Sequence, residues 1–339
     1  MGFKDILVHV DSTPASAVRL RLGISLARRF GARLSGLHVT PNPDVPPYFK
    51  PSAVARIAKL YRESAREAAV VAEAHFRAAI KDLDVATVWQ SIEGDIAGVL
   101  AERARLSDLL VLGQYDTENP PTIAAFTTPE KVVVDAGTPI LVVPTRGSFD
   151  DMGRHVLMAW DGSRESARAL RDAMPLLRSA ERVVVLAIDP ARQGHMHPNA
   201  NPDELAAHLA RHGVPAKTTE VSFGEKNVTD MLLAQAAQLR ADLLIMGAYG
   251  HPRLLEFWLG GTTQDLLNRA PLPVLLSHEM PHVERCPVSK EVPCQTPPAP
   301  PWRGRRSPAV FRRSAFRPWA SYFRLPPDAV VEIGRQIAI

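Results

Sequence analysis

The sequence contains few cysteines and no long apolar segment. Its two cysteines, Cys286 and Cys294, both lie beyond position 280, so no disulfide framework supports the rest of the chain. Such cysteine usage is typical of a reducing cytoplasm. No run of 18 apolar residues occurs, and the first residues lead directly into an apolar strand, so we expect neither a transmembrane helix nor a signal peptide. These features predict a cytoplasmic location.

The sequence also lacks the motifs of several enzyme classes. It has no Gly-x-Ser-x-Gly nucleophile turn, no His-Glu-x-x-His metal motif and no lysine placed after a glycine loop. His195 and His197 have no nearby carboxylates or thiols to complete a metal site, and the two cysteines are not spaced as metal ligands. We therefore expect no catalytic residues and no metal site, and we favour a binding protein over a fast enzyme.

The formal net charge of +4 comes from one end of the chain. Residues 281–339 carry ten Arg or Lys and four Asp or Glu, a balance of +6, so the rest of the chain sums to −2. The basic character therefore gives no reason to expect nucleic-acid binding by residues 1–280. The same stretch holds eleven prolines and no sustained periodicity, which predicts a mostly disordered tail over residues 280–339.

Apolar runs alternate with helix-forming stretches through residue 278, which predicts an α/β protein with a parallel sheet and right-handed crossovers. Ser12 to Pro14 predicts a helix start with a capping hydroxyl, and Asp161 to Ser163 opens a helix expected to run through Leu177. Strands are expected at Lys4–Val10, Leu34–Val39, Val85–Ile92, Asp108–Gly113, Thr138–Pro144, His155–Trp160, Arg182–Ile188, Lys217–Phe223, Asp242–Gly247 and Leu272–Ser277.

The second part of this pattern repeats the first. An offset of 134 aligns Asp108-Leu-Leu with Asp242-Leu-Leu and Gly113 with Gly247, without a gap over about 34 residues. Near the start of each part, Asp11 pairs with Asp161 at an offset near 150, and a longer middle helix in the first part absorbs the difference. Internal duplication is the simplest account, so we predict two domains, at residues 1–146 and 152–279.

A glycine pattern follows the fourth strand of the second half. Gly247 and Gly250 end an apolar strand, and Gly260, Gly261, Thr262 and Thr263 precede a stretch with helical spacing. Glycine permits close approach of the backbone, and a helix N-terminus offers free N–H groups and a positive dipole end. Together they favour an anion site suited to phosphate, although two tight turns would give the same pattern.

The pattern G-x2-G-x9-G at this place resembles the nucleotide loop of universal stress proteins. That family usually carries Ser or Thr after the third glycine, where this chain has Gly261. The missing hydroxyl is worth roughly 0.5–1.5 kcal/mol of binding. In the first half Asp116, Phe126 and Thr127 replace the glycines, so we expect a degenerate loop there, unless that half binds through other contacts.

The resemblance, which covers about residues 3–278, implies a fold and a ligand. It implies two flavodoxin-like domains of the adenine-nucleotide α-hydrolase-like kind, each a five-stranded parallel sheet of order 3-2-1-4-5. The family usually pairs domains through their fifth strands, so the halves are expected to form an internal pseudo-dimer. It also implies one adenine nucleotide, ATP or ADP with Mg2+, bound by the second half of a stress-response sensor or adaptor.

Family positions also assign individual residues to the ligand. Asp161 would hold base or ribose, although capping a helix or forming a turn is an alternative role. Ala159, Ile188 and Met246 match positions that flank adenine, and plain core packing is the alternative. Trp160 could pack under the nucleotide or between the halves. Two other functional classes stay open for the chain: an interaction module without a nucleotide, and a slow ATP hydrolase.

The tail gives the first prediction. A chain ending at His278 should keep its melting temperature within a few degrees of the full chain, because the composition changes just past a complete fifth strand. Thermal denaturation of both lengths tests this. A large drop, or insolubility, would show that residues 281–339 pack on the domains. If the full chain binds nucleic acid or lipid and the shortened chain does not, the tail is a basic arm around Arg303-Gly-Arg-Arg306. If neither binds, the tail is an uninvolved extension.

Overall fold

The computed structural model describes residues 2–42, 51–114, 129–188, 201–221, 227–248 and 262–278. All of these residues belong to one compact unit, Met1–His282. The predicted tail over 280–339 lies outside the described residues, as do His195, His197 and both cysteines.

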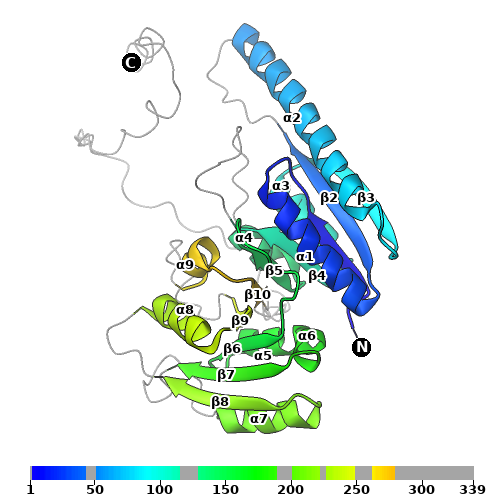
Figure 1. Ribbon diagram of the computed structural model, residues 1–339. Helices are drawn as coiled ribbons and strands as arrows, with labels where there is room; N and C mark the ends of the chain where they lie inside the picture. The colour runs from blue at the N-terminus through cyan, green and yellow to red at the C-terminus, as the bar shows by residue number, and fades with distance from the viewer. Residues whose placement is uncertain are drawn as a thin grey trace, which may run out of the picture. The chain divides into compact units, whose positions relative to one another are not determined.

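Strands and helices alternate through each half of this unit (Figure 1). The first half contains β1 (Asp5–His9), α1 (Ala15–Phe30), β2 (Arg33–Pro41), α2 (Pro51–Ile80), β3 (Thr87–Gly94), α3 (Ile96–Ala104), β4 (Leu109–Gly113), α4 (Pro129–Ala136) and β5 (Ile140–Val143). The second half contains β6 (His155–Trp160), α5 (Arg164–Asp172), α6 (Met174–Arg178), β7 (Arg182–Ile188), α7 (Pro202–Arg211), β8 (Ala216–Val221), α8 (Val228–Leu239), β9 (Leu243–Gly247), α9 (Thr262–Arg269) and β10 (Val274–Ser277).

The described strands form one ten-stranded sheet of order β3-β2-β1-β4-β5-β10-β9-β6-β7-β8. Neighbouring strands are parallel within each half, which confirms the predicted α/β class and parallel pairing. The one antiparallel neighbour pair among these strands is β5 with β10, where the two halves meet. The second half is therefore a continuation of the first half's sheet and not a separate layer.

A carboxylate at the start of the fourth strand of each half holds the start of its first strand. Asp108 accepts hydrogen bonds from the backbone N–H groups of Lys4 (2.6 Å) and Asp5 (3.0 Å). Asp242 likewise accepts from the N–H groups of Gly153 and His155 (2.8 and 3.1 Å). The repeated Asp-Leu-Leu sequence thus has a structural reason, since the carboxylate satisfies backbone donors that a strand end leaves open.

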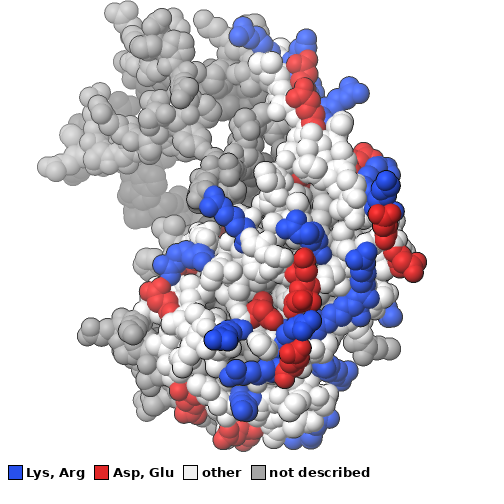
Figure 2. Space-filling model, in the orientation of Figure 1, with Lys and Arg blue, Asp and Glu red and all other residues white. Residues whose placement is uncertain are grey.

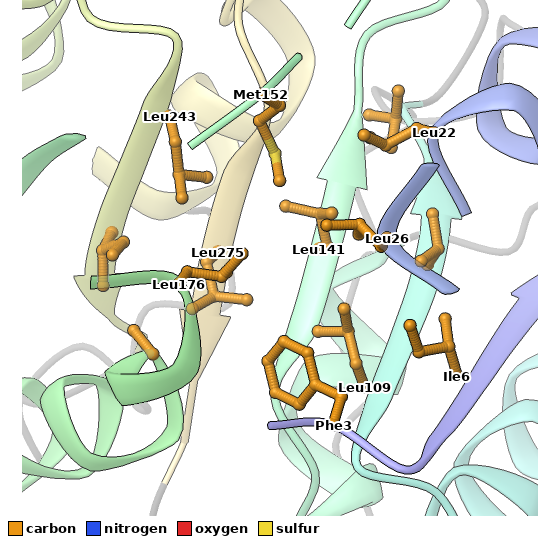
Figure 3. Close-up of a cluster of buried hydrophobic side chains, with 14 of the residues drawn as sticks. Phe3, Ile6, Leu22, Leu26, Leu109, Leu141, Met152, Leu176, Leu243 and Leu275 are labelled. Atoms are coloured by element: carbon orange, nitrogen blue, oxygen red, sulfur yellow. The ribbon is translucent and has the colours of Figure 1, made fainter. Parts of the chain in front are cut away.

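The two halves are connected by the pairing of β5 with β10 and by an apolar cluster to which both halves contribute. In the antiparallel pair Leu275 is opposite Leu141 and Val274 is opposite Val142, which confirms the predicted contact between the fifth strands. All four side chains are buried. Figure 3 shows Leu141 of the first half and Leu275 of the second within one apolar cluster, to which both halves contribute labelled residues. Pairing β5 with β10 therefore removes an open edge from each half.

Two apolar clusters cover the two faces of the sheet. One contains side chains of α1, α2, α5, α6 and α7, and the other contains side chains of α3, α4, α8 and α9. Residues of the strands alternate between the clusters, as the period of two along a strand requires. Neighbours in β10 show this: Leu275 belongs to the first cluster and Leu276 to the second. Both faces are thus buried, as expected of a parallel sheet.

Two local predictions were wrong. The helix expected from Ser163 through Leu177 is divided into α5 and α6, because Pro175 stands in the first turn of a new helix. At α1 the N-cap residue is Pro14, and no side chain caps the helix. The hydroxyl of Thr13, expected to cap, instead donates to the Asp11 carboxylate at 2.5 Å. The middle helix is longer in the first half, as predicted: α2 has 30 residues and α7 has 10.

Charged side chains of both signs are interspersed over the described part of the face in Figure 2. This distribution is in keeping with a −2 balance for residues 1–280 and differs from the single-sign stripe of a nucleic-acid surface. Within the described residues, no helix combines the length and apolar character that a membrane span needs.

A disulfide placed across the junction tests the strand register. With Cys286 and Cys294 changed to serine, Val142→Cys with Val274→Cys should form a bond reversible by dithiothreitol, and the oxidised form should melt at a higher temperature. Opposite residues of an antiparallel pair have Cα atoms about 4.5–5.5 Å apart, within the range of a disulfide, and a long closed loop adds about 4 kcal/mol of stability. Mass spectrometry and thermal melting measure the outcome.

The control for that experiment is Val142→Cys with Val183→Cys. Val183 lies in β7, separated from β5 by β10, β9 and β6. This pair should stay reduced. Equal cross-linking of both pairs, or none in the first pair once the variant is shown to be folded, would contradict the register.

Candidate functional site

Five of the predicted ligand residues lie at the carboxyl ends of three strands that are adjacent in the sheet, β9, β6 and β7. Open α/β sheets bind their ligands at this edge. The five are Ala159, Asp161, Ile188, Met246 and Gly247. Met246 is buried and Ala159 half-buried, and both pack on the α8 and α9 face of the sheet, so the core-packing role weighed for them is realised. A contact with adenine stays a prediction.

The glycine loop itself is only partly described. Thr262 and Thr263 form the first turn of α9, which agrees with the predicted helix start. Gly250, Gly260 and Gly261 lie outside the described residues, as do Asp116, Phe126 and Thr127 of the first half. The N-terminus of α9 follows the loop that leaves β9, and the role of its N–H groups toward phosphate stays a prediction.

Asp161 forms a tight turn just after β6. One oxygen, Oδ1, accepts from the backbone N–H of Ser163 (3.0 Å) and from its hydroxyl (2.6 Å). The Ser163 hydroxyl oxygen in turn accepts from the N–H of Ser166 and caps α5. Gly162 between them has φ +73°, a conformation that favours glycine. The turn role weighed for Asp161 is thus present, while its Oδ2 has no hydrogen-bond partner within the described part of the chain.

Gly247 is a packing position for α5. A Cβ atom there would lie 2.5 Å from the backbone nitrogen of Ser166 and 2.8 Å from Cβ of Glu165, so only glycine fits. Glu165 is 2% exposed, and its carboxylate accepts from Arg164 Nε at 2.8 Å. Sequence reasoning assigned this glycine to close approach of a phosphate, whereas its observed close neighbour is a helix backbone. The buried Glu165 was missed, because charged residues are rarely buried and no pattern marked it.

Two buried polar atoms at this edge have no hydrogen-bond partner among the described residues. They are the indole Nε1 of Trp160 at the end of β6 and the hydroxyl of Ser277 at the end of β10. Ser277 is the register neighbour of Gly247. A buried donor without a partner costs about 1–3 kcal/mol, so such groups in a folded protein call for an explanation, such as water or a ligand. Trp160 packs on the cluster shared by the halves and is half-buried.

The matching place in the first half is filled by a guanidinium. Arg19 of α1 is 3% exposed, and its Nε donates to the carbonyl oxygen of His9 at 3.1 Å. Its Nη2 donates to Asp11 Oδ2 at 2.6 Å. The guanidinium also lies against Gly113, the last residue of β4, where a side chain would collide with it. Asp11 Oδ1 accepts from the N–H and hydroxyl of Thr13, as Asp161 Oδ1 does from Ser163, although Ser12 does not have the positive φ of Gly162.

The ion pair changes the titration of its neighbours. Burial would raise the pKa of Asp11, but the charges of Arg19 and His9 and the hydrogen bonds from Thr13 lower it to about 2. The pKa of His9 is lowered to about 4, mainly by burial, with smaller contributions from the charges of Arg19 and His38 and with Asp11 opposing the shift. His38 is itself buried and its Nδ1 lies 2.9 Å from the carbonyl oxygen of Val10. The first-half crevice therefore holds a cluster of ionisable groups.

Sequence reasoning missed this cluster, although a signal was present. At the offset of 150 that aligns Asp11 with Asp161, Arg19 corresponds to Ala169. An arginine on the inner side of a helix, eight residues after an aspartate at a strand end, indicates a buried pair. The shared buried positions Ser16 and Ser166 support this alignment.

No group of three or more His, Cys, Asp or Glu suited to a metal ion occurs within the described ranges. Asp161 and Glu165 are carboxylates near one strand end, but Glu165 is paired with Arg164. Asp161 Oδ2 has no hydrogen-bond partner within the described residues, and carboxylate oxygens are among the ligands that Mg2+ takes in proteins.

The titration of His9 predicts acid sensitivity. Its folded pKa of about 4 lies below the unfolded value of 6.5, so stability is full above pH 6.5 and falls as the pH drops toward 4. In His9→Gln, the decrease in the free energy of unfolding between pH 6.5 and 4 should be smaller than in wild type by about 2 kcal/mol. This figure already includes a discount for the partial exposure of His9 to solvent. Asp11 contributes at lower pH, since its stabilisation is lost between about pH 4 and 2.

Urea denaturation at several pH values from 7 to 4.5 measures that slope. His75→Gln, on the exposed face of α2, controls for the loss of one histidine. An unchanged slope in His9→Gln would mean that His9 titrates alike in the folded and unfolded chains.

Comparison with known proteins places this geometry in a family. The model of the universal stress protein family matches the chain twice, at residues 2–144 and 152–278. Among solved structures, a universal stress protein from Archaeoglobus fulgidus DSM 4304 has a TM-score of 0.59 at 15% identity, covering 81% of this chain and 96% of that chain. A putative universal stress protein from Pseudomonas aeruginosa UCBPP-PA14 has a TM-score of 0.52 at 14% identity, covering 81% and 93%.

A search among curated proteins gave no significant match. At these identities the solved structures show the fold alone, whereas the family model covers most of the chain and matches each half of the internal repeat. The residues at the carboxyl ends of β6, β7 and β9 thus lie in the second of two matched regions, and the chain belongs to the universal stress protein family.

Proposed function

We propose that the second half binds one adenine nucleotide, ATP or ADP with Mg2+, at the carboxyl ends of β6, β7 and β9. The observation that carries the proposal is the Asp161 carboxylate. It is fixed by a turn, and its second oxygen faces no described partner, whereas the same oxygen of Asp11 holds a guanidinium. A fixed carboxylate acceptor suits the hydroxyl groups of a ribose.

Three further features support a ligand at this edge. The buried Trp160 and Ser277 donors lack partners among the described residues, and a bound molecule or water would satisfy them. α9 begins at Thr262, directly after the glycine pattern in the sequence, and a helix N-terminus offers N–H groups that suit a phosphate. We also propose that each half acts as a flavodoxin-like unit of order 3-2-1-4-5, since β3-β2-β1-β4-β5 and β8-β7-β6-β9-β10 follow that order in the sheet.

In this proposal the protein is a cytoplasmic stress-response sensor or adaptor whose state depends on the nucleotide. The sequence contains no Walker lysine or nucleophile motif, which favours binding over turnover. Slow ATP hydrolysis is the second candidate, favoured by the Asp161 Oδ2 atom, which has no partner within the described residues and could orient a water. Release of phosphate from ATP over hours, abolished by Asp161→Asn, would support it.

Calorimetry with ATP and ADP tests the site through a matched pair of variants. Asp161→Asn should weaken nucleotide binding at least tenfold, because a charged acceptor becomes a neutral amide. Asp11→Asn, the same change in the first half, should leave affinity and a stoichiometry of one per chain unchanged. Equal loss in both variants, or no nucleotide bound by the folded wild type, would contradict the proposal.

The glycine loop is tested separately. Gly250→Asp copies Asp116 of the first half into the second. The added carboxylate would repel phosphate by up to roughly 4 kcal/mol at 4 Å and an effective dielectric of about 20, and even half of that exceeds a tenfold loss. Asp116→Gly should restore nothing in the first half, because Phe126 and Pro120-Pro121 remain. Full binding by Gly250→Asp, or two equivalent sites, would contradict the assignment.

A further inference from the structure

The Arg19 guanidinium occupies the place in the first half where its sheet would take a ligand. β1 lies between β2 and β4 in the sheet, so the strand order reverses beside it. The guanidinium bridges the end of β1, through the His9 carbonyl oxygen, and the end of β4, where it lies on Gly113. Ligands of open α/β sheets bind in the crevice at such a switch point.

The contacts of this side chain resemble those of a bound ligand. Nε and Nη2 both have acceptors, one carbonyl and one carboxylate, at 3.1 and 2.6 Å. Any residue other than glycine at position 113 would collide with the guanidinium, so the glycine makes room for the cation. Removing one partner of a buried pair leaves an uncompensated charge, so an incoming ligand cannot displace the guanidinium without that penalty.

The second half has a different residue at the helix position that matches Arg19. Ala169, which matches Arg19, is completely buried in the apolar cluster and is too short to reach Asp161. The aspartate accepts the same two hydrogen bonds in both halves, from the backbone N–H and hydroxyl of Thr13 or of Ser163 at the matching position. Both strand ends thus have an aspartate held by the same two hydrogen bonds, and within the described residues a side chain neutralises this aspartate in the first half alone.

We propose that Arg19 is an internal ligand that closes the first-half crevice, and that Ala169 at the matching helix position leaves the second-half aspartate accessible to an external ligand. The second clause rests on the proposed nucleotide site. The first does not, because it concerns only contacts within residues 9–113. In the sequence, Asp116 and Phe126 also replace two of the loop glycines of the second half, so Arg19→Ala by itself is not expected to add a nucleotide site.

Chemical rescue tests the internal ligand without any nucleotide. Arg19→Ala should leave a crevice lined by Asp11, the His9 carbonyl and Gly113 that takes a small guanidinium. Ethylguanidinium at millimolar concentration should raise the melting temperature of Arg19→Ala by several degrees. Arg28→Ala, an exposed arginine on the same helix, and Arg19→Met, which fills the space without charge, should show no such rise.

The outcomes of the rescue are distinct. A selective rise for Arg19→Ala supports an internal ligand. The same shift in all three variants, or none in a folded Arg19→Ala, would mean that Arg19 is an ordinary structural ion pair and would overturn the proposal. If Arg19→Ala does not fold, Arg19→Gly is refolded with and without ethylguanidinium, and circular dichroism measures recovery of the native spectrum. Recovery that depends on ethylguanidinium supports an internal ligand, and equal recovery in both conditions overturns the proposal.

Placing an arginine at position 169 tests whether this helix position controls ligand access in the second half. Ala169→Arg should pair with Asp161 and lower nucleotide affinity at least 100-fold, while Ala169→Met, of similar length without charge, should stay within tenfold of wild type. Circular dichroism and melting check that both variants fold. Wild-type affinity in a folded Ala169→Arg, or equal loss in Ala169→Met, would overturn the clause. If wild type binds no nucleotide, the proposed function fails, and the rescue experiment still decides the role of Arg19.

Discussion

The antiparallel pairing of β5 with β10 is the constraint on which the rest of the structure depends. It joins the strands of both halves into one sheet and buries Leu141 and Leu275 in a cluster that neither half completes alone. Arg29 adds to the junction, because its guanidinium donates to the carbonyl oxygens of Met152 and Ser179 in the second half. The open edges of the described sheet are therefore β3 and β8, which carry polar residues such as Gln90 and Lys217.

The two halves of the sheet share most features of their strand ends but differ around one aspartate. Both keep the aspartate at the start of the fourth strand, which ties strand ends together and serves folding alone. Both also keep the acid-bearing turn after the first strand. They differ in the second carboxylate oxygen: Asp11 Oδ2 accepts from the Arg19 guanidinium, whereas Asp161 Oδ2 has no partner within the described residues. A duplicated fold thus kept its structural carboxylates and changed the surroundings of one site.

Much of the fold could be predicted because it depends on local pattern. Apolar runs such as Leu109–Gly113 and their repeat at Leu243–Gly247 mark buried strands, and β5 and β10 follow from their place in the repeat. The same reasoning places Ala159, Asp161, Ile188, Met246 and Gly247 at one edge. The α5–α6 break and the bare N-cap were missed although each lies at a proline, Pro175 or Pro14, that the sequence shows. The packing role of Gly247 and the buried Glu165 and Arg19 were missed because they depend on contacts between elements, which periodicity does not encode.

The tether of Arg19 has a thermodynamic consequence. A side chain attached to its own helix is present at a fixed effective concentration, commonly millimolar or higher, whatever the surrounding solution contains. The stability that the Arg19–Asp11 pair gives the first half is therefore constant with respect to metabolites. A half whose acid lacks such a tethered partner is stabilised only in proportion to the logarithm of free ligand concentration, once that exceeds the dissociation constant. If the second half binds the proposed nucleotide, one chain thus combines a half of constant stability with a half whose stability depends on the nucleotide concentration.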